Sequence, residues 1–344
     1  MTQPHRVLVA GPAWVGDMVM AQSLFKVLHA RTPDTVVDVL APAWSLPLLS
    51  RMDEVRRGIA LPTGHGELAL PARRELGRAL RAEGYDQAIV LPRSLKAALV
   101  PFFARIPRRT GYRGEWRYGL INDMRPLDKR VLHQTVQRFA ALGLPPESPL
   151  PPPIPRPQLR VDHENQARLV RELGLDLSRP AVAFMPGAEY GPAKRWPAIY
   201  YGDVGARLVE QGYQVWLLGS AKDREAVDWV MRSTRTEFVD LCGRTRLEDA
   251  IDLLGLASAA LTNDSGLMHV AAAVGTPLVA IYGSSTPDYT PPLTERAIVL
   301  YDRLSCSPCF KRTCPRRNTQ CLTHIGPDRV WDVLSSLISN EQVA

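Results

Sequence analysis

A proline-rich stretch divides this chain of 344 residues into two halves, and it restricts the fold more than any other feature. Residues 145–157 read PPESPLPPPIPRP and contain eight prolines. Proline lacks the N–H group that helices and central strands require, so we expect an extended, semi-rigid connector here. A chain of this length is expected to form about two domains, each able to bury its own core. We therefore predict domains at 1–150 and 161–327, a linker at 151–160 and a terminal helix at 328–344, which we expect to pack back toward the first domain.

Short apolar runs alternate with helical patterns on both sides of this linker. The apolar runs lie at residues 5–10, 36–40, 59–61 and 88–91, and then at 181–185, 214–218, 238–241, 256–261 and 277–282. Such alternation predicts a parallel, doubly wound α/β sheet in each half. Two similar α/β domains joined by a hinge also predict a ligand cleft between them.

The net charge of +7 is concentrated in the first half. Residues 1–155 carry 21 Lys+Arg and 13 Asp+Glu, a net of +8, and the remainder carries 21 and 22, a net of −1. The density is greatest in RIPRRTGYRGEWR, at residues 105–117. This patch suits the phosphates of nucleic acid, of lipid headgroups or of a phosphorylated sugar, although a solvated charged surface is the common alternative.

Composition is ordinary for a soluble globular protein, with 45% hydrophobic and 22% charged residues. No apolar run is long enough to span a bilayer. The run Val7–Ala10 is too short for the core of a signal peptide, and Asp17 follows closely. We therefore expect a cytoplasmic protein.

The first strand-to-helix loop is rich in glycine but does not have a nucleotide-binding fingerprint. It reads GPAWVGDM at residues 11–18, which matches neither G-x-G-x-x-G nor a phosphate loop with Lys-Ser/Thr. Dinucleotide binding is therefore weakly supported at this loop. Asp17 stands where a general base can meet a substrate; the alternative is that it only caps the helix.

In the second half, four loops follow strands and should gather at one rim of the sheet. They lie at residues 187–194, 219–223, 264–269 and 283–286. They offer backbone amides, small residues and one cation, Lys194, and this set fits a nucleotide diphosphate. The alternative for Lys194 is an ordinary surface lysine.

The third of these loops belongs to the segment TNDSGLMH, residues 262–269, which we expect to form a strand end, a sharp turn and a helix start. Asp264 and Ser265 are good capping residues, and Gly266 allows close approach to the backbone. The helix N-terminus would suit a pyrophosphate, with His269 one turn further in. The alternative is a plain strand-to-helix turn with a capping aspartate.

Metal binding is indicated only weakly. The chain contains no Asp-x-Asp pair, so a carboxylate-held Mg²⁺–diphosphate is unsupported. Four cysteines, Cys306, Cys309, Cys314 and Cys321, are spaced C-x2-C-x4-C-x6-C and can hold structural zinc or an iron–sulfur cluster. Free thiols in a surface loop are the alternative, because a reducing cytoplasm disfavours disulfides. We give these cysteines no catalytic role.

Several segments together resemble one family. They are GPAWVGDM (11–18), LSRM (49–52), LVPFF (99–103), GAEYGPAKRWP (187–197), GSAKD (219–223), TNDSGLMHVAAA (262–273) and PDYTPP (287–292). In this order they resemble the ADP-heptose:lipopolysaccharide heptosyltransferases of glycosyltransferase family 9, and most closely those of type II. The resemblance implies the GT-B fold, in which two Rossmann-like doubly wound domains face each other across a cleft.

The resemblance also implies roles for individual residues. Asp17 matches the general base that deprotonates the acceptor hydroxyl, and Lys194 matches the lysine on the donor phosphates. Asp264 matches the acid that holds donor-sugar hydroxyls. The remaining donor-binding candidates are Gly187, Tyr190, Lys222, Asp223, Thr245 near the adenine, the amides of Ser265, Gly266 and Leu267, and His269. Lys96 and Arg113 are candidate acceptor contacts.

The implied reaction transfers L-glycero-D-manno-heptose from ADP-heptose, with inversion and without a required cofactor, to the first heptose of the lipid A–Kdo–heptose inner core. The basic first half would then face a phosphorylated acceptor in an anionic membrane, so the enzyme would be peripheral to the inner membrane and would have no nucleic-acid partner. Physical argument cannot separate this acceptor from those of type I or III enzymes. A Rossmann oxidoreductase and a nucleic-acid-binding protein with a zinc module are the alternatives from other classes.

Overall fold

The computed structural model describes residues 4–343 except for residues 63 and 65. The chain forms two compact units, Met1–Pro157 and Gln158–Ala344. The boundary falls inside the predicted linker, and each end of the linker is tied to its own unit. Ser23 Oγ donates to the carbonyl of Pro155 at 2.6 Å, and the N–H of Leu159 donates to the carbonyl of Ala273 at 2.9 Å.

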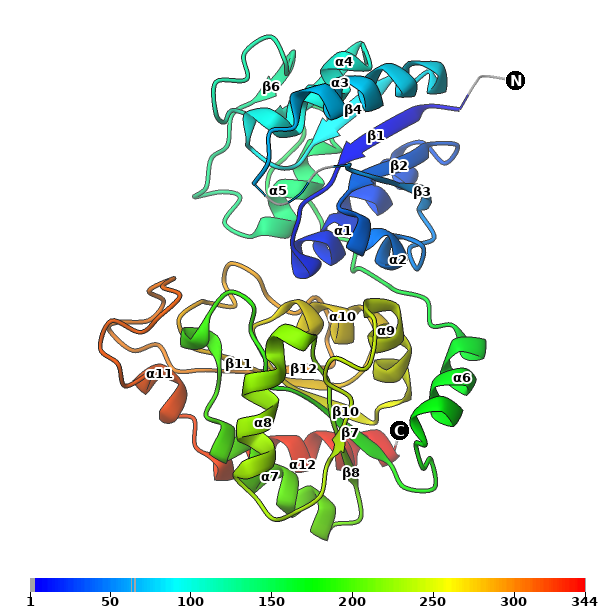
Figure 1. The fold of residues 1–344 in the computed structure, drawn as a ribbon. Coiled ribbons are helices and arrows are strands. Elements are labelled where there is room, and N and C mark those ends of the chain that lie inside the picture. Colours follow the sequence, from blue (N-terminus) through cyan, green and yellow to red (C-terminus); the bar gives the residue numbers. More distant parts are fainter. Residues whose placement is uncertain (1–3, 63, 65, 344) are drawn as a thin grey trace. The chain divides into compact units, whose positions relative to one another are not determined.

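The first unit contains a six-stranded parallel sheet in the order β3-β2-β1-β4-β5-β6 (Figure 1). Its strands are β1 (Arg6–Ala10), β2 (Val36–Ala41), β3 (Val55–Ala60), β4 (Gln87–Val90), β5 (Arg108–Tyr112) and β6 (Asp123–Arg125). Its helices are α1 (Val15–Arg31), α2 (Leu46–Leu49), α3 (Leu70–Ala79), α4 (Leu99–Phe103) and α5 (Thr135–Leu142). The strand order reverses between β1 and β4, and in such sheets ligands bind outside the carboxyl ends of the strands at this switch point.

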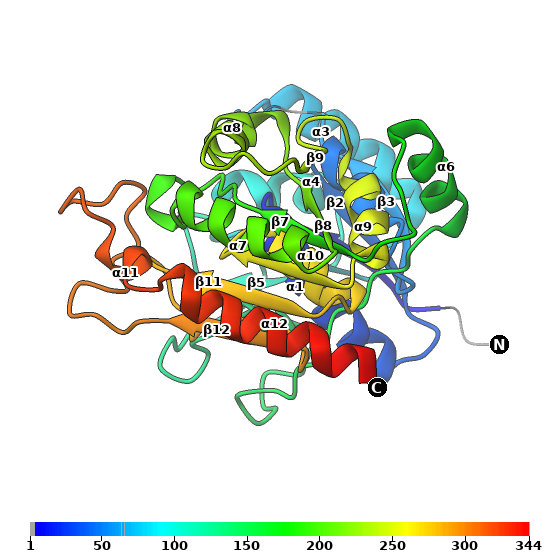
Figure 2. The ribbon, with the colours of Figure 1, turned by 90° about the horizontal axis from the view of Figure 1, so that it is seen from below.

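The second unit repeats this topology with the order β12-β11-β10-β7-β8-β9 (Figure 2). Its strands are β7 (Ala181–Met185), β8 (Gln214–Leu217), β9 (Val239–Asp240), β10 (Ala259–Asn263), β11 (Leu278–Tyr282) and β12 (Ala297–Tyr301). Its helices are α6 (His163–Leu173), α7 (Ala198–Glu210), α8 (Arg224–Arg232), α9 (Leu247–Leu256), α10 (Gly266–Val274), α11 (Gln320–Thr323) and α12 (Pro327–Val343). The order reverses between β7 and β10. The expected α/β class is therefore confirmed in both halves.

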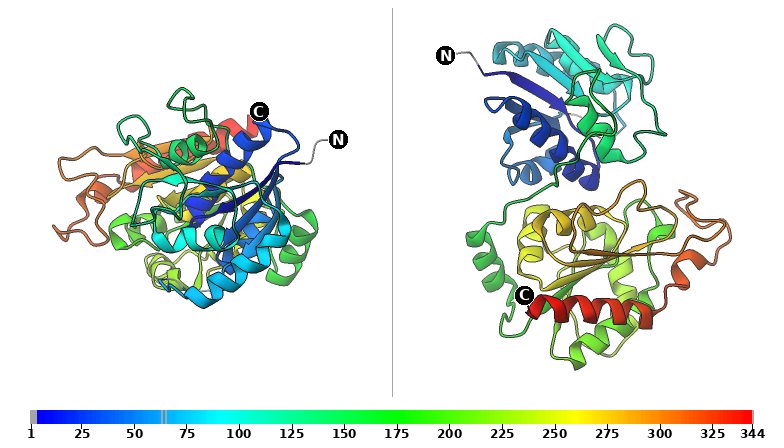
Figure 3. Two further views of the ribbon diagram at one scale, coloured as in Figure 1. Left: turned by 90° about the horizontal axis from the view of Figure 1, so that it is seen from above. Right: turned by 180° about the vertical axis from the view of Figure 1, so that it is seen from behind.

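Central strands are buried on both faces, as expected for parallel sheets covered by helices (Figure 3). In the second unit, α12 contributes Val330, Leu334, Leu337 and Ile338 to the same apolar core as the strands β7, β10 and β11. The terminal helix is thus built into the second unit, and its packing toward the first domain stays a prediction. Across the described residues, no helix is both long and apolar enough to traverse a bilayer.

The structure adds elements that the sequence pattern did not predict. β6 and β12 extend the two sheets, and α11 follows the cysteine-rich segment. A 3₁₀ turn precedes each of the short helices α2 and α4, at Ala43–Ser45 and at Leu95–Ala98. Each of these helices contains a proline, Pro47 in α2 and Pro101 in α4, which cannot donate a main-chain hydrogen bond.

Candidate functional site

Two of the four predicted loops of the second unit meet at its switch point. β7 and β10 are paired neighbours, and the loops that follow them carry Lys194 and Asp264. The loops after β8 and β11 lie on either side, because the carboxyl ends of parallel strands share one edge of the sheet. The structure therefore gathers all four loops at one edge.

Lys194 and Asp264 are in direct contact. The Lys194 ammonium group donates to Asp264 Oδ2, and the hydroxyl of Ser285 donates to the same oxygen. The side chains of Lys194 and Asp264 are only 17% and 5% exposed, so Lys194 is not an ordinary surface lysine. Its Nζ also lies 5.1 Å from the centre of the Tyr190 ring. This cluster is a partly desolvated charge pair at the position where ligands bind in such sheets.

Asn263 joins the two central loops, and sequence reasoning did not single it out. Its Oδ1 accepts from the N–H of Trp196 at 2.9 Å, and its Nδ2 donates to the carbonyl of Pro186 at 2.7 Å. These bonds fix the end of β10 against both sides of the Lys194 loop. The position of Asn263 immediately before Asp264 was the only signal in the sequence.

The start of α10 is not capped in the way the sequence suggested. Ser265 is the N-cap residue and has an extended backbone, but its side chain makes no capping hydrogen bond. The Asp264 carboxylate instead accepts from Lys194 and Ser285. The first amides of α10 therefore lack a side-chain partner at the N-cap, and Ser265, Gly266 and Leu267 are half-buried. Such a helix start suits an anion.

His269 is the fourth residue of α10, at the end of the first turn of the helix, and is 5% exposed. Burial lowers its pKa from 6.5 to about 4, with a smaller opposing effect of Asp264 and a further lowering by Lys194. The imidazole is therefore neutral at neutral pH and does not supply a positive charge to a phosphate.

The pH dependence of stability should report this buried histidine. The folded-state pKa lies below the unfolded one, so the unfolded chain binds a proton first as pH falls. The free energy of unfolding is then at its full value above about pH 6.5 and decreases toward pH 4. At about pH 5 it is lower by about 2 kcal/mol. Urea unfolding at neutral and acidic pH measures it. A His269→Gln variant should lose that part of the pH dependence, and an unchanged pH slope would contradict the assignment.

The remaining donor-site candidates lie around the same edge. Gly187 is required sterically, because a Cβ there would come within 2.1 Å of Asp223 Oδ1. Asp223 Oδ2 accepts from the N–H and the hydroxyl of Ser220, at 3.0 and 2.8 Å. Lys222 is 74% exposed and pairs with Glu189 at 2.5 Å. Thr245 lies between β9 and α9 and is half-buried.

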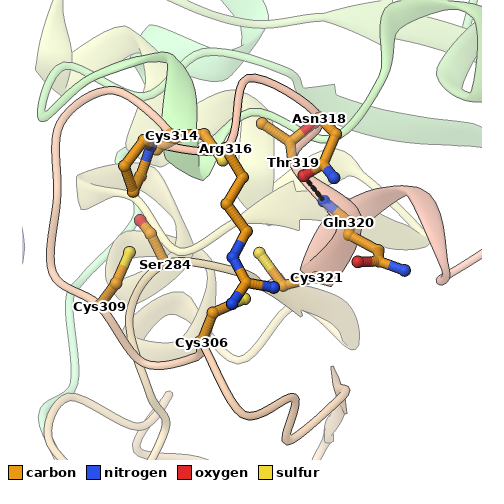
Figure 4. A pocket seen from close by; sticks show the side chains of 11 residues that line it. Ser284, Cys306, Cys309, Cys314, Arg316, Asn318, Thr319, Gln320 and Cys321 are labelled. Atoms are coloured by element: carbon orange, nitrogen blue, oxygen red, sulfur yellow. Dashed lines mark hydrogen bonds between the residues drawn. The ribbon is translucent and has the colours of Figure 1, made fainter.

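The cysteine-rich segment contacts the same loops. Its four cysteines are free and line one small cavity of about 30 Å³, together with Ala193 and Ser284 (Figure 4). Figure 4 shows the side chain of Arg316 extending among the thiols. Within the part of the chain that the structure describes, no three His, Cys, Asp or Glu side chains are arranged to hold a metal ion. The cluster thus does not show the arrangement that its spacing suggested.

Hydrogen bonds from the cysteine-rich segment hold the loops after β7 and β11 in place. The N–H groups of Cys309 and Phe310 donate to the carbonyl of Ser284 at 3.1 and 2.7 Å, next to Ser285. The N–H of Ala193, next to Lys194, donates to the carbonyl of Arg312 at 3.0 Å. The segment therefore supports both partners of Asp264, a positioning contribution that the sequence did not reveal.

Tyr190 links the cysteine-rich segment to Lys194, so a substitution of Tyr190 tests this support. Its hydroxyl donates to the carbonyl of Phe310 at 2.7 Å, and its ring lies below the Lys194 ammonium group. Tyr190→Phe removes only the hydrogen bond, so we expect KM for the donor to rise roughly fivefold, about 1 kcal/mol, with a smaller change in kcat. Steady-state kinetics with varied donor measures this. Tyr213→Phe, on another loop, is the matched control, and equal effects of both changes would contradict the linkage.

In the first unit, the candidate base and acceptor contacts also share one edge. Asp17, Lys96 and Arg113 follow β1, β4 and β5, which are adjacent parallel strands. Asp17 is half-buried in the first turn of α1, whose N-cap residue is Trp14. Asp17 is therefore not the capping residue itself. Lys96 is half-buried and Arg113 is exposed.

Comparisons with known proteins agree with this geometry. Residues 73–320 match the family model of glycosyltransferase family 9 (heptosyltransferase). Lipopolysaccharide heptosyltransferase 2 of Escherichia coli is 47% identical over 98% of this chain and 99% of its own length. Lipooligosaccharide heptosyltransferase 2 of Haemophilus influenzae is 45% identical over 86% of this chain and 88% of its own.

A solved structure covers the whole architecture. The structure of E. coli ADP-heptose lps heptosyltransferase II superposes with a TM-score of 0.86 at 44% identity, and covers 98% of this chain and 99% of that one. This confirms the expected GT-B fold and decides against the oxidoreductase alternative. The chain is an enzyme that belongs to glycosyltransferase family 9, the heptosyltransferases.

Proposed function

We propose that this enzyme transfers L-glycero-D-manno-heptose from ADP-heptose to the first heptose of the lipopolysaccharide inner core, with inversion at the anomeric carbon. Full-length identity of 47% to a lipopolysaccharide heptosyltransferase 2 supports this step. The observation that carries the donor assignment is the contact of Lys194 with Asp264 beside the uncapped start of α10.

The second unit supplies the chemistry that a nucleotide diphosphate needs. Lys194 and the first amides of α10, from Ser265, Gly266 and Leu267, bind the two phosphates. Both contacts on Asp264 fall on Oδ2, so Oδ1 is the oxygen that we assign to a donor-sugar hydroxyl. Gly187, Tyr190, Lys222, Asp223, Thr245 and His269 complete the proposed donor site.

Departure of ADP is assisted electrostatically. Negative charge develops on the diphosphate as the glycosidic bond breaks, and a fixed ammonium group and helix-end amides stabilise it without reorganisation. The Lys194 side chain is already held by Asp264 and by the Tyr190 ring, so its position is set before the donor binds. The proposed reaction proceeds in this way without a required cofactor.

The first unit supplies the base and the acceptor contacts. Asp17 takes the proton from the acceptor hydroxyl as that oxygen attacks the anomeric carbon from the face opposite the leaving group, so the configuration inverts. Lys96 and Arg113 are the proposed contacts for the anionic acceptor, a Kdo–heptose core carried on lipid A. The acceptor is embedded in a membrane, so we propose that the enzyme acts at the cytoplasmic face of the inner membrane.

A transfer assay with defined acceptors tests the proposal. ADP-heptose is supplied with core lipopolysaccharide truncated after Kdo, after the first heptose, or after the second heptose. We expect transfer only to the acceptor that ends in the first heptose. Transfer to the Kdo-terminated acceptor would indicate a type I enzyme, and transfer only to the longest acceptor would indicate type III. NMR of the product gives the anomeric configuration.

A further inference from the structure

A hollow on the first unit lies outside the proposed catalytic and donor sites. It is formed on α3, α4 and the turns that follow them, and has a volume of about 730 Å³. Its lining residues are Leu70, Pro71, Arg74, Glu75, Arg78, Arg81, Phe103 and Arg105. With the adjacent Phe102, we call this surface the basic–apolar patch.

The positive charge of the patch is unbalanced. Glu75 is the single acidic residue in the lining, against four arginines. Partial desolvation and the charges of Arg105, Arg78 and Arg74 lower the pKa of Arg81, so these three guanidinium groups each lie within electrostatic range of Arg81.

The arginines of the patch differ in pairing from others in the same unit. Arg56 and Arg57 form ion pairs with Asp38 and Glu83. For Arg74, Arg78 and Arg105, the described residues provide no such acidic partner. Arg81 donates to a carbonyl, that of Phe103, at 2.9 Å, rather than to a carboxylate. A group of close, unpaired guanidinium groups is suited to an external anion.

Large apolar side chains are exposed on the same two helices and just before the first of them. Leu70 at the start of α3 is 44% exposed, Phe102 on α4 is 41% exposed, and Leu68 just before α3 is 51% exposed. Phe102 and Phe103 pack edge to face at 5.6 Å, which gives a firm aromatic surface. Basic residues with neighbouring leucine and phenylalanine are typical of surfaces that enter the boundary between lipid headgroups and acyl chains.

We propose that the basic–apolar patch docks this enzyme on an anionic phospholipid bilayer, with its arginines on the headgroup phosphates and with Leu70 and Phe102 at the acyl boundary. The inference rests on the proposed function in that the acceptor of the reaction is carried by a membrane lipid. A membrane accounts for both chemistries of the patch, whereas exposed leucines add nothing to the binding of nucleic acid.

Vesicle sedimentation with the full chain tests the docking. The probes are vesicles of phosphatidylcholine alone and vesicles of equal parts phosphatidylcholine and phosphatidylglycerol. The variants are Arg74→Gln/Arg78→Gln, which removes two unpaired charges, and Leu70→Ser, which removes an apolar contact. The matched control is Lys129→Gln/Arg130→Gln, which removes two exposed charges elsewhere on the same unit.

We expect the wild type to bind the anionic vesicles and not the neutral ones. Each headgroup-facing arginine contributes about fivefold, so the arginine double variant should bind roughly 25-fold more weakly. Leu70→Ser should also weaken binding, and the control variant should bind like the wild type. Equal binding to both vesicle types, or equal losses in the patch and control variants, would overturn the proposal.

Turnover with a deacylated, water-soluble acceptor separates this proposal from the proposed function. The arginine double variant should keep wild-type turnover on it. Loss of that turnover would make the patch part of the acceptor site and overturn the docking proposal, whereas absence of transfer by the wild type would refute the proposed function alone. Binding of a labelled RNA that competes with the vesicles and is lost in the double variant would reassign the patch to nucleic acid.

Discussion

Replacement of Asp17 by asparagine is expected to reduce kcat for heptose transfer by about 10²–10⁴-fold while binding of ADP-heptose is kept. Asparagine has the same shape but cannot accept the proton of the acceptor hydroxyl. The donor is assigned to residues of the second unit, so its affinity should not depend on Asp17. Steady-state transfer kinetics and calorimetric titration with ADP-heptose in the absence of acceptor measure the two quantities separately.

The control for this variant is Asp34→Asn. Asp34 is an exposed carboxylate in the turn between α1 and β2, at the amino end of the sheet and therefore at the edge opposite Asp17. It should leave kcat unchanged. Asp17 also lies in the first turn of α1, where a carboxylate favours the helix dipole, so a small loss of stability of about 0.3–1 kcal/mol is expected. Near-normal turnover of Asp17→Asn would show that another group is the base.

The framework of both units could be predicted because local pattern and tertiary burial agree. AVAFM forms β7 at the predicted residues, since a short, wholly apolar run between loops has no stable place except a strand covered on both sides. Once the strands are parallel, the loops after them must share an edge, and Lys194 and Asp264 were brought together by that rule. The pairing of β7 with β10 then makes the loops that carry Lys194 and Asp264 direct neighbours.

Parts that depend on contacts between distant segments could not be predicted. Ser285 became a partner of Asp264 only because β11 lies beside β10. The sequence favoured Ser265 as a helix cap, but no capping bond forms. β6 has three residues, DMR, and carries no apolar alternation that could identify it. The support given by the cysteine-rich segment also depends on main-chain bonds, which leave no trace in residue type.

Replacement of Lys194 by glutamine is the second change from which we expect a large loss of kcat/KM. The ammonium group at the switch point is the fixed cation assigned to the departing diphosphate, so its loss should lower kcat/KM by about 10²–10³-fold. Asp264 is 5% exposed in its side chain and would lose its cationic partner, so stability should fall as well, by less than the roughly 3–5 kcal/mol of a fully buried pair because Lys194 is still partly hydrated.

Two ligands separate the catalytic role of Lys194 from a purely structural one. In Lys194→Gln, affinity for ADP should fall at least about tenfold, because the charge–phosphate contact is lost, while affinity for adenosine should stay unchanged. Arg171→Gln, an exposed cation on α6 of the same unit, is the control and should alter neither affinity. If both ADP and adenosine bind normally to Lys194→Gln while its Tm falls, the Lys194–Asp264 pair serves only the fold. The diphosphate would then have to be held by the α10 amides without a cation, which the partial positive charge of a helix start does not match.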